Sequence, residues 1–228
     1  MATTDAPIEL LIQQINKDFP RGLPTRPLGW PQDIELALID AIFSARAKYG
    51  QPESEGQSAT GVQAVVHRWK QHRSSDTAKP HVANDLTVLA AESEESLLRV
   101  LGNKSQPSGR TKAQVVIDAA NALVQANVTS ADDLTDPALG AARTAFLSVR
   151  GCGDTLWRYF LMQSGHGDVK PDRWLLHYVR SAVGDDKLAQ DAVVRSVHTA
   201  AERLNVEVSA LDHAIWLKAS GRLEEQEA

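Results

Sequence analysis

The chain has 228 residues, of which 43% are hydrophobic, so it is long enough to bury a sizeable core in one domain or two closely packed subdomains. Its formal net charge of −5 argues against a generic nucleic-acid coat protein, which would be basic. The single cysteine, Cys152, excludes an intramolecular disulfide and any thiolate-ligated metal cluster built from this chain alone.

No apolar run approaches the roughly 20 residues that a membrane-spanning helix needs. The N-terminal segment MATTDAPIEL lacks the basic-then-apolar pattern of a signal peptide. We therefore expect a cytoplasmic protein that does not enter a membrane, with short polar segments at both ends.

Helical periodicity dominates the chain, and no segment shows the convincing alternation of a strand. After the Pro- and Gly-rich segment FPRGLPTRPLGWPQ, apolar spacing predicts helices over Asp33–Ala47, Val62–His72, Asp85–Ala91, Glu94–Leu101 and Thr111–Ala126. Polar loops separate these helices, and Gly102 supplies a helix stop.

The second half of the chain continues the helical pattern. Ser130 and Asp133 have the spacing of a capping box and predict a short helix. Pro137 suits the first turn of a helix that runs to about Val149. The next predicted helix carries Leu156, Trp157, Phe160 and Leu161 on one side. The last three cover Arg173–Val183, Asp186–Leu204 and Leu211–Ala219. The predicted fold class is therefore all-α.

The most informative stretch joins two of these helices through a Gly-x-Gly turn. Gly151 and Gly153 flank one residue, and without a Cβ the backbone amides of such a turn can approach a phosphate closely. Asp172 stands just before the next helix. This pairing indicates a protein that grips a nucleic-acid backbone and acts on a nucleotide beside it.

Basic residues gather around this turn although the whole chain is acidic. Between residues 141 and 180 there are six Lys or Arg against three acids. Each basic residue taken alone is also compatible with an ordinary solvated surface position. The candidate phosphate contacts are Arg110, Lys112, Arg150, Lys170 and Arg173.

These features resemble the helix-hairpin-helix DNA glycosylases of the endonuclease III-like (HhH-GPD) superfamily. In that family an apolar helix runs into Gly-x-Gly, here FLSVRGCGDT, and an Asp, here Asp172 in VKPDRWLLHYV, comes after the second helix. IELALIDAIFSARAKYG is similar to the family's early apolar helix with its DNA-probing loop. SGRTKAQVVIDAANALV and LDHAIWLKASGR resemble two further family helices in the same order. The resemblance covers most of the chain.

The resemblance implies two helical subdomains: residues 30–167, which end in the helix-hairpin-helix, and residues 1–29 with 168–228. The cleft between them is expected to hold a base flipped from double-stranded DNA, with Asp172 at its edge. The implied activity is that of a DNA glycosylase in base excision repair, which hydrolyses the N-glycosidic bond of a damaged or modified base.

The sequence departs from the family pattern at several positions. Thr155 replaces the Lys whose amine forms a Schiff base in members that also cleave the strand, so we expect a monofunctional glycosylase. No cysteine follows Gly221, so no iron–sulfur cluster is expected. Arg150 stands where a Pro is common, and Arg46 where a Gln often enters the DNA stack.

Asp172 is the candidate catalytic residue. A carboxylate beside the sugar stabilises the positive charge of an oxocarbenium-like transition state and orients the attacking water. The helix that begins at Arg173 favours an ionised Asp at its N-terminus. Asp is also a common helix cap, so the alternative is that Asp172 merely caps this helix. Both roles can hold at once.

The remaining candidates surround the DNA. Arg46 can refill the gap left by a flipped base, and Trp174 can line a base pocket or belong to the core. A monovalent cation at Gly151–Gly153, bridging to a phosphate, is implied by the family alone; no other cofactor or metal is expected. The predicted DNA-binding residues are Arg46, Arg150, Gly151, Gly153, Thr155, Lys170 and Arg173.

Other notable residues are expected to be structural. Trp157 should belong to the core, Asp154 should cap the helix that follows it, and Cys152 should be partly buried. His177, His213 and Trp216 should pack or cap locally.

Two other functions stay open. The missing Lys, the absent cluster and the net negative charge are compatible with a non-catalytic helix-hairpin-helix DNA-binding protein. A protein-interaction domain that no longer contacts DNA is the other alternative. The sequence does not indicate which base would be excised, nor the oligomeric state.

Overall fold

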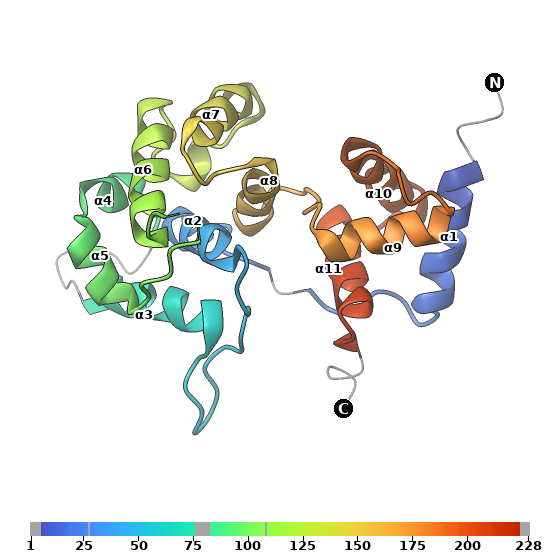
Figure 1. Ribbon diagram of the computed structural model, residues 1–228, viewed down its shortest axis with the longest axis horizontal. Coiled ribbons are helices and arrows are strands. Elements are labelled where there is room, and N and C mark those ends of the chain that lie inside the picture. Colours follow the sequence, from blue (N-terminus) through green and yellow to red (C-terminus); the bar gives the residue numbers. More distant parts are fainter. Residues whose placement is uncertain (1–5, 27, 76–82, 108, 224–228) are drawn as a thin grey trace. The chain divides into compact units, whose positions relative to one another are not determined.

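The structure is a computed structural model and describes residues 6–26, 28–75, 83–107 and 109–223 (Figure 1). These residues form eleven α-helices and one 3-10 helix, with an isolated β-bridge between Ser54 and Gln57 and no strand. The prediction of an all-α fold is confirmed. The helices are α1 (Ala6–Asp18), α2 (Ile34–Ser44), α3 (Gly61–Ser75), α4 (Leu86–Ala91), α5 (Glu94–Leu101), α6 (Lys112–Gln125), η1 (Ala131–Asp133), α7 (Asp136–Ser148), α8 (Asp154–Gln163), α9 (Arg173–Val183), α10 (Gln190–Leu204) and α11 (Val208–Ala219).

The helices belong to two compact units with separate cores. The hairpin unit is Leu28–His166 and contains α2 to α8. The terminal unit combines residues 1–27 with 167–228 and contains α1 and α9 to α11. The sequence predicts residues 30–167 for the first unit and residues 1–29 with 168–228 for the second.

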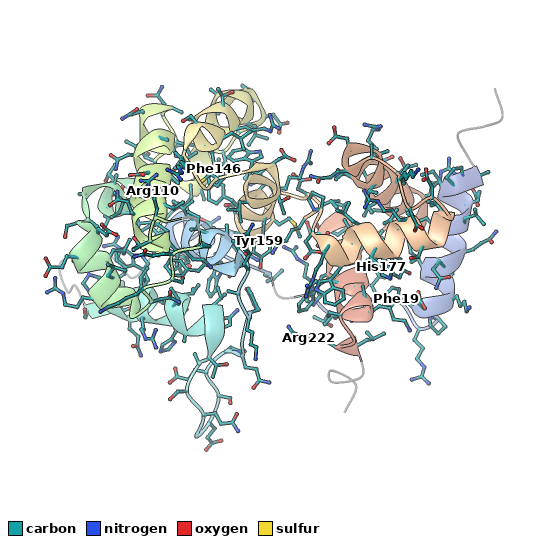
Figure 2. The ribbon with its side chains drawn as sticks, viewed as in Figure 1. Phe19, Arg110, Phe146, Tyr159, His177 and Arg222 are labelled. Carbon is teal, nitrogen blue, oxygen red and sulfur yellow. The ribbon has the colours of Figure 1, made fainter. Side chains whose placement is uncertain are left out.

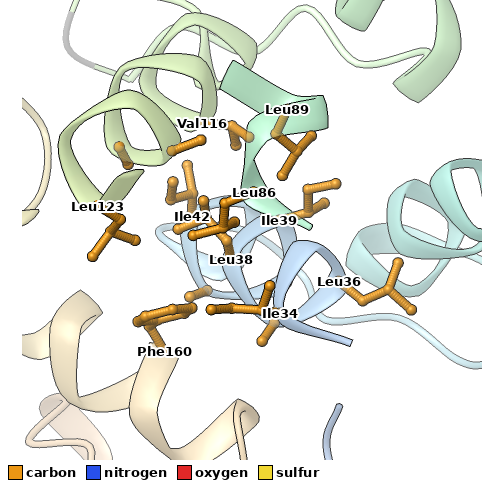
Figure 3. Packing of buried hydrophobic residues seen from close by; sticks show 14 of the residues in the cluster. Ile34, Leu36, Leu38, Ile39, Ile42, Leu86, Leu89, Val116, Leu123 and Phe160 are labelled. Atoms are coloured by element: carbon orange, nitrogen blue, oxygen red, sulfur yellow. The ribbon is translucent and has the colours of Figure 1, made fainter. Parts of the chain in front are cut away.

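The hairpin unit is built around α2, in which every residue from Ile34 to Phe43 is buried. A helix with no solvent-facing side is stable only inside a core. α2 accordingly packs against α3, α4, α6 and α8. Figure 3 shows side chains of these helices around α2, among them Leu89 of α4, Val116 of α6 and Phe160 of α8.

One acid of α2, Glu35, is fully buried and fully engaged. Its carboxylate accepts hydrogen bonds from Arg73 Nε at 2.9 Å, Trp69 Nε1 at 2.8 Å and the amide of Asp85 at 3.0 Å. Burial raises the pKa of Glu35, and the Arg73 guanidinium opposes that rise. This cluster ties α2 to α3 and to the start of α4.

The terminal unit contains a helix that the sequence did not predict. α1 corrects the expectation of a short polar segment at the N-terminus; the C-terminal one falls on residues 224–228, outside the described residues. Leu11, Ile15 and Phe19 are buried at intervals of four residues, and most of their neighbours are polar. Tyr178 donates a hydrogen bond to Asp18 at 2.8 Å, which holds the end of α1 against α9.

α10 begins at Gln190 rather than at the predicted Asp186. Residues 185–188 form a turn, in which the amide of Leu188 donates to the carbonyl of Asp185. Arg180 then donates to the carbonyl of Leu188 at 2.8 Å. These bonds replace the first helical turn that apolar spacing alone predicted.

α11 begins at Val208, three residues before the predicted Leu211. Glu207 caps the helix, because its carboxylate accepts the amides of Ser209 at 3.0 Å and Ala210 at 2.7 Å. Glu is an unusual N-cap residue, so the sequence offered no conventional start signal here.

Replacing Arg73 by Met should lower the free energy of unfolding by about 3–5 kcal/mol, because it leaves the Glu35 carboxylate buried without its counter-charge. Denaturant titration measures the effect, and Arg99→Met, on an exposed position of α5, is the control. Equal stability of the two variants would contradict this account of the core.

Candidate functional site

The turn between α7 and α8 presents backbone at the surface. The amide of Cys152 donates to the carbonyl of Val149 at 3.0 Å and closes the turn. Gly151 adopts a φ of +106°, which side-chain-bearing residues rarely adopt, and a Cβ there would lie 3.4 Å from Val115. Gly151 and Gly153 are exposed, whereas Cys152 is buried. The amides at the start of α8 are therefore sterically open to a ligand.

An aromatic cluster beneath the turn fixes its position. Trp157 is only 3% exposed and lies 5.5 Å from Phe146 and 5.8 Å from Phe160, measured between ring centroids. Trp157 is thus a core residue, as expected. Phe146 comes from α7 and the other two rings from α8, so the cluster holds the two helices of the hairpin together.

Asp154 does not cap α8, contrary to expectation. Its carboxylate instead accepts hydrogen bonds from Arg143 and Arg158, each at 2.8 Å. Although burial acts to raise it, the pKa of Asp154 is lowered, because both guanidinium groups donate to the carboxylate. Two Arg against one Asp, together with exposed Arg150, make the hairpin surface positive.

Arg46 lies on the exposed turn that follows α2, where it adopts a φ of +52°. The turn is anchored from below by Lys112, whose Nζ donates to the carbonyls of Phe43 and Ala45, both at 2.7 Å. Lys112 is only 5% exposed, so its predicted role as a phosphate contact is wrong. Arg110, another candidate, forms an ion pair with Asp118.

In the terminal unit, Asp172 is the N-cap of α9. Its Oδ1 accepts the amides of Trp174 at 2.8 Å and Leu175 at 3.1 Å. Among the described residues, no donor bonds its Oδ2. The carboxylate is half-buried, and buried Pro171 precedes it. The capping role is therefore present, and one carboxylate oxygen remains for another partner.

The other predicted residues of this unit flank Asp172 closely. Exposed Arg173 stacks over the ring of half-buried Trp174 at 4.4 Å. Lys170 is half-buried, and its carbonyl accepts the amide of Asp172 at 2.7 Å. The structure thus brings together Lys170, Asp172, Arg173 and Trp174 here, and Arg150, Gly151, Gly153 and Thr155 at the hairpin.

α11 supports the residues just before Asp172, which was not predicted from the sequence. Ser209 Oγ accepts the amide of Asp168 at 3.2 Å and donates to its carbonyl at 3.1 Å. Asp212 Oδ1 accepts the amide of Lys170 at 3.1 Å. The available signal was an acid placed among the apolar residues of LDHAIW, in a segment already matched to the family.

The histidines differ from one another. His213 stacks on Trp216 with ring centroids 5.9 Å apart, and burial lowers its pKa to about 4, so local packing describes it. His177 is an exposed residue of α9 (Figure 2). It lines a surface hollow of about 330 Å³ together with Asp18 and Lys218.

No group of three or more His, Cys, Asp or Glu among the described residues is arranged to hold a metal ion. Burial, followed by the nearby Asp118, raises the pKa of Cys152 to about 12, so the thiol stays protonated. At the hairpin, the carbonyl of Val149 accepts the amide of Cys152, and the carbonyl of Gly153 accepts the amides of Leu156 and Trp157.

Lys112→Met should destabilise the protein, because unsatisfied buried acceptors cost about 1–3 kcal/mol each. Burial lowers the pKa of Lys112 from 10.5 to about 8, so between these values the unfolded chain binds more protons than the folded one. The contribution of Lys112 to stability therefore rises with pH over this window. Urea titrations across this pH window measure the difference in free energy of unfolding between wild type and Lys112→Met. The control is Lys104→Met, a substitution at an exposed position. A difference that shrinks as pH rises would contradict the prediction.

Three comparisons relate the chain to known proteins. The crystal structure of Methanocaldococcus jannaschii 8-oxoguanine DNA glycosylase is similar in fold, with a TM-score of 0.52 and 16% identity over 94% of this chain and 86% of that chain. At this identity the similarity shows a common fold alone. No curated protein matches the sequence. None of the described helices has the length and apolar composition of a membrane-spanning segment. A family model described as a domain of unknown function, DUF8548, matches residues 9–220, and the chain belongs to this family.

Proposed function

We propose that this protein is a monofunctional DNA glycosylase that flips a damaged or modified base from double-stranded DNA and hydrolyses its N-glycosidic bond. The observation that carries the proposal is Asp172, a half-buried carboxylate that caps α9 through one oxygen and keeps the other unbonded among the described residues. The fold it shares with a DNA glycosylase supports the proposal.

The hairpin would bind the DNA backbone. Exposed Gly151 and Gly153 let a phosphate approach the first amides of α8, where the helix dipole favours an anion. Arg150 adds a positive charge at the same turn, and a cation on the hairpin carbonyls would bridge to the same phosphate. These contacts would neutralise phosphate charge and would not contact the bases. They would therefore position the protein on the DNA without making it sequence-specific.

Other residues would act on the nucleotide. Lys170 and Arg173 flank Asp172 and are the phosphate contacts proposed for the terminal unit. Arg46 would occupy the gap left by the flipped base, since its turn projects it to solvent from an anchored backbone. Trp174 would stack on the flipped base.

Asp172 would act on the sugar. As the bond between C1′ and the base breaks, the base takes the bonding electron pair and positive charge builds on the sugar. The Asp172 carboxylate stabilises this charge and orients a water molecule. The water's hydroxyl bonds to C1′, and its remaining proton neutralises the departing base.

Thr155 sets the expected product. It occupies the first turn of α8, and its hydroxyl cannot form the Schiff base through which an amine would lead to strand cleavage. The DNA strand should therefore remain intact and carry an abasic site, which breaks only in hot alkali.

A non-catalytic DNA-binding protein is the second candidate. The two cap bonds to Asp172 favour it, because they give that carboxylate a structural reason to be present. An enzyme depends on the charge of Asp172, whereas a binder depends only on its capping oxygen.

Asp172→Asn should abolish excision, with a rate at least about a hundredfold lower, because Asn keeps the cap and loses the negative charge. End-labelled duplexes, each with one altered base and 8-oxoguanine among them, are scored with and without hot alkali. Asp85→Asn is the matched control, since Asp85 caps α4 through the amide of Thr87 at 3.0 Å. Equal excision by wild type and Asp172→Asn would favour a different catalytic residue, and no excision by either would favour the binder.

Arg150→Ala should weaken duplex binding similarly for all sequences, and lower the slope of log K against log salt by about 0.9 through the loss of one phosphate contact. Binding titrations at several salt concentrations measure this slope, with Arg99→Ala as the matched exposed control. An unchanged slope would remove Arg150 from the proposed interface.

A further inference from the structure

A buried carboxyl group lies behind the turn that ends in Asp172. Asp212 of α11 is 6% exposed, and its Oδ1 accepts the amide of Lys170 at 3.1 Å. The carbonyl of Lys170 accepts the amide of Asp172, whose side chain in turn accepts the amides of Trp174 and Leu175. One chain of hydrogen bonds therefore runs from α11 through Asp172 to the start of α9.

Burial and the surrounding charges together set the protonation state of Asp212. Burial is the main reason that the pKa of Asp212 is raised to about 8. The Asp172 carboxylate contributes to this rise, whereas the hydrogen bond from the Lys170 amide and the positive charges of Lys170 and Arg26 oppose it. His213, its neighbour on α11, is neutral near pH 7 because its pKa is lowered. At neutral pH Asp212 thus holds a proton.

We propose that Asp212 is a positioning residue for Asp172, which holds the Lys170–Asp172 turn in its working geometry while it carries a proton and releases that geometry when it ionises. The inference rests on the proposed glycosylase activity. Its physical basis is that an ionised Asp212 would be a buried charge that is poorly solvated, and that the Asp172 carboxylate would repel it. Separation of the two groups relieves the repulsion and moves Asp172.

This assignment explains why an acid occupies a position where a neutral acceptor would bond Lys170 equally well. Asn at position 212 would keep an acceptor oxygen for that amide and carry no titrating proton. Ala would lose the acceptor and leave the amide unsatisfied. The two substitutions therefore separate the structural contact from the titration.

Single-turnover excision rates as a function of pH provide the first test. The wild-type rate should fall above about pH 8, by about tenfold per pH unit once Asp212 is mostly ionised. Asp212→Asn should keep the neutral-pH rate and lose this alkaline decline. Asp212→Ala should be slower by roughly tenfold to a hundredfold at every pH with unchanged DNA affinity, because a small displacement of the acting group is costly. Asp186→Asn, on an exposed turn of the same unit, should match wild type. An alkaline decline that persists in Asp212→Asn would overturn the proposal.

The second test uses the wild-type protein alone, so it holds even if the variants fail to fold. The carboxyl ¹³C resonance of Asp212 should titrate near pH 8, and the amide resonances of Trp174 and Leu175 should shift with the same midpoint. Amides that ignore this titration would overturn the inference while leaving glycosylase activity intact. Amides that follow it in a protein that releases no base would instead remove the proposed function.

Discussion

The hydrogen bonds from the amides of Trp174 and Leu175 to Oδ1 of Asp172 are the constraint on which the proposed chemistry depends. Because these bonds hold one carboxylate oxygen, the backbone of α9 sets the direction of the other. α11 adds a second constraint, since Ser209 and Asp212 bond the residues just before Asp172. Capping and the proposed catalysis are compatible roles for Asp172, because the cap supplies the fixed geometry that an electrostatic catalyst requires.

In the hairpin unit too, exposed residues are held in place by buried ones. α2 is buried on all sides, so the carbonyls at its C-terminal end need donors from the protein, and Lys112 supplies them. Arg46 lies just after this anchored end and is exposed. The hairpin turn likewise rests on the rings of Phe146, Trp157 and Phe160, which leaves its glycines exposed at a fixed position.

Local signals were sufficient to predict most of the helices, and to place Asp172 directly before α9 and Gly153 directly before α8. α5 and α9 have their predicted bounds, because apolar spacing and cap residues act within one or two turns. α1 was not predicted although Leu11, Ile12 and Ile15 have helical spacing, and its packing partners lie far along the chain, in α9 and α10. Lys112 resembles a surface cation locally, yet its acceptor Phe43 is 69 residues away. Asp212 likewise accepts a hydrogen bond from a distant residue, Lys170, which is 42 residues away. Such contacts form only in the folded chain, so local sequence patterns do not predict them.

The most direct test of the central claim is to incubate the protein with genomic DNA and identify the released free bases by mass spectrometry, while counting strand breaks in the same sample. The account predicts release of one class of altered base, an equal number of alkali-labile sites and no breaks before alkali. Strand breaks without alkali would contradict the monofunctional chemistry assigned to a site with Thr155 in place of an amine. DNA that is bound but yields no free base would contradict the catalytic role of Asp172.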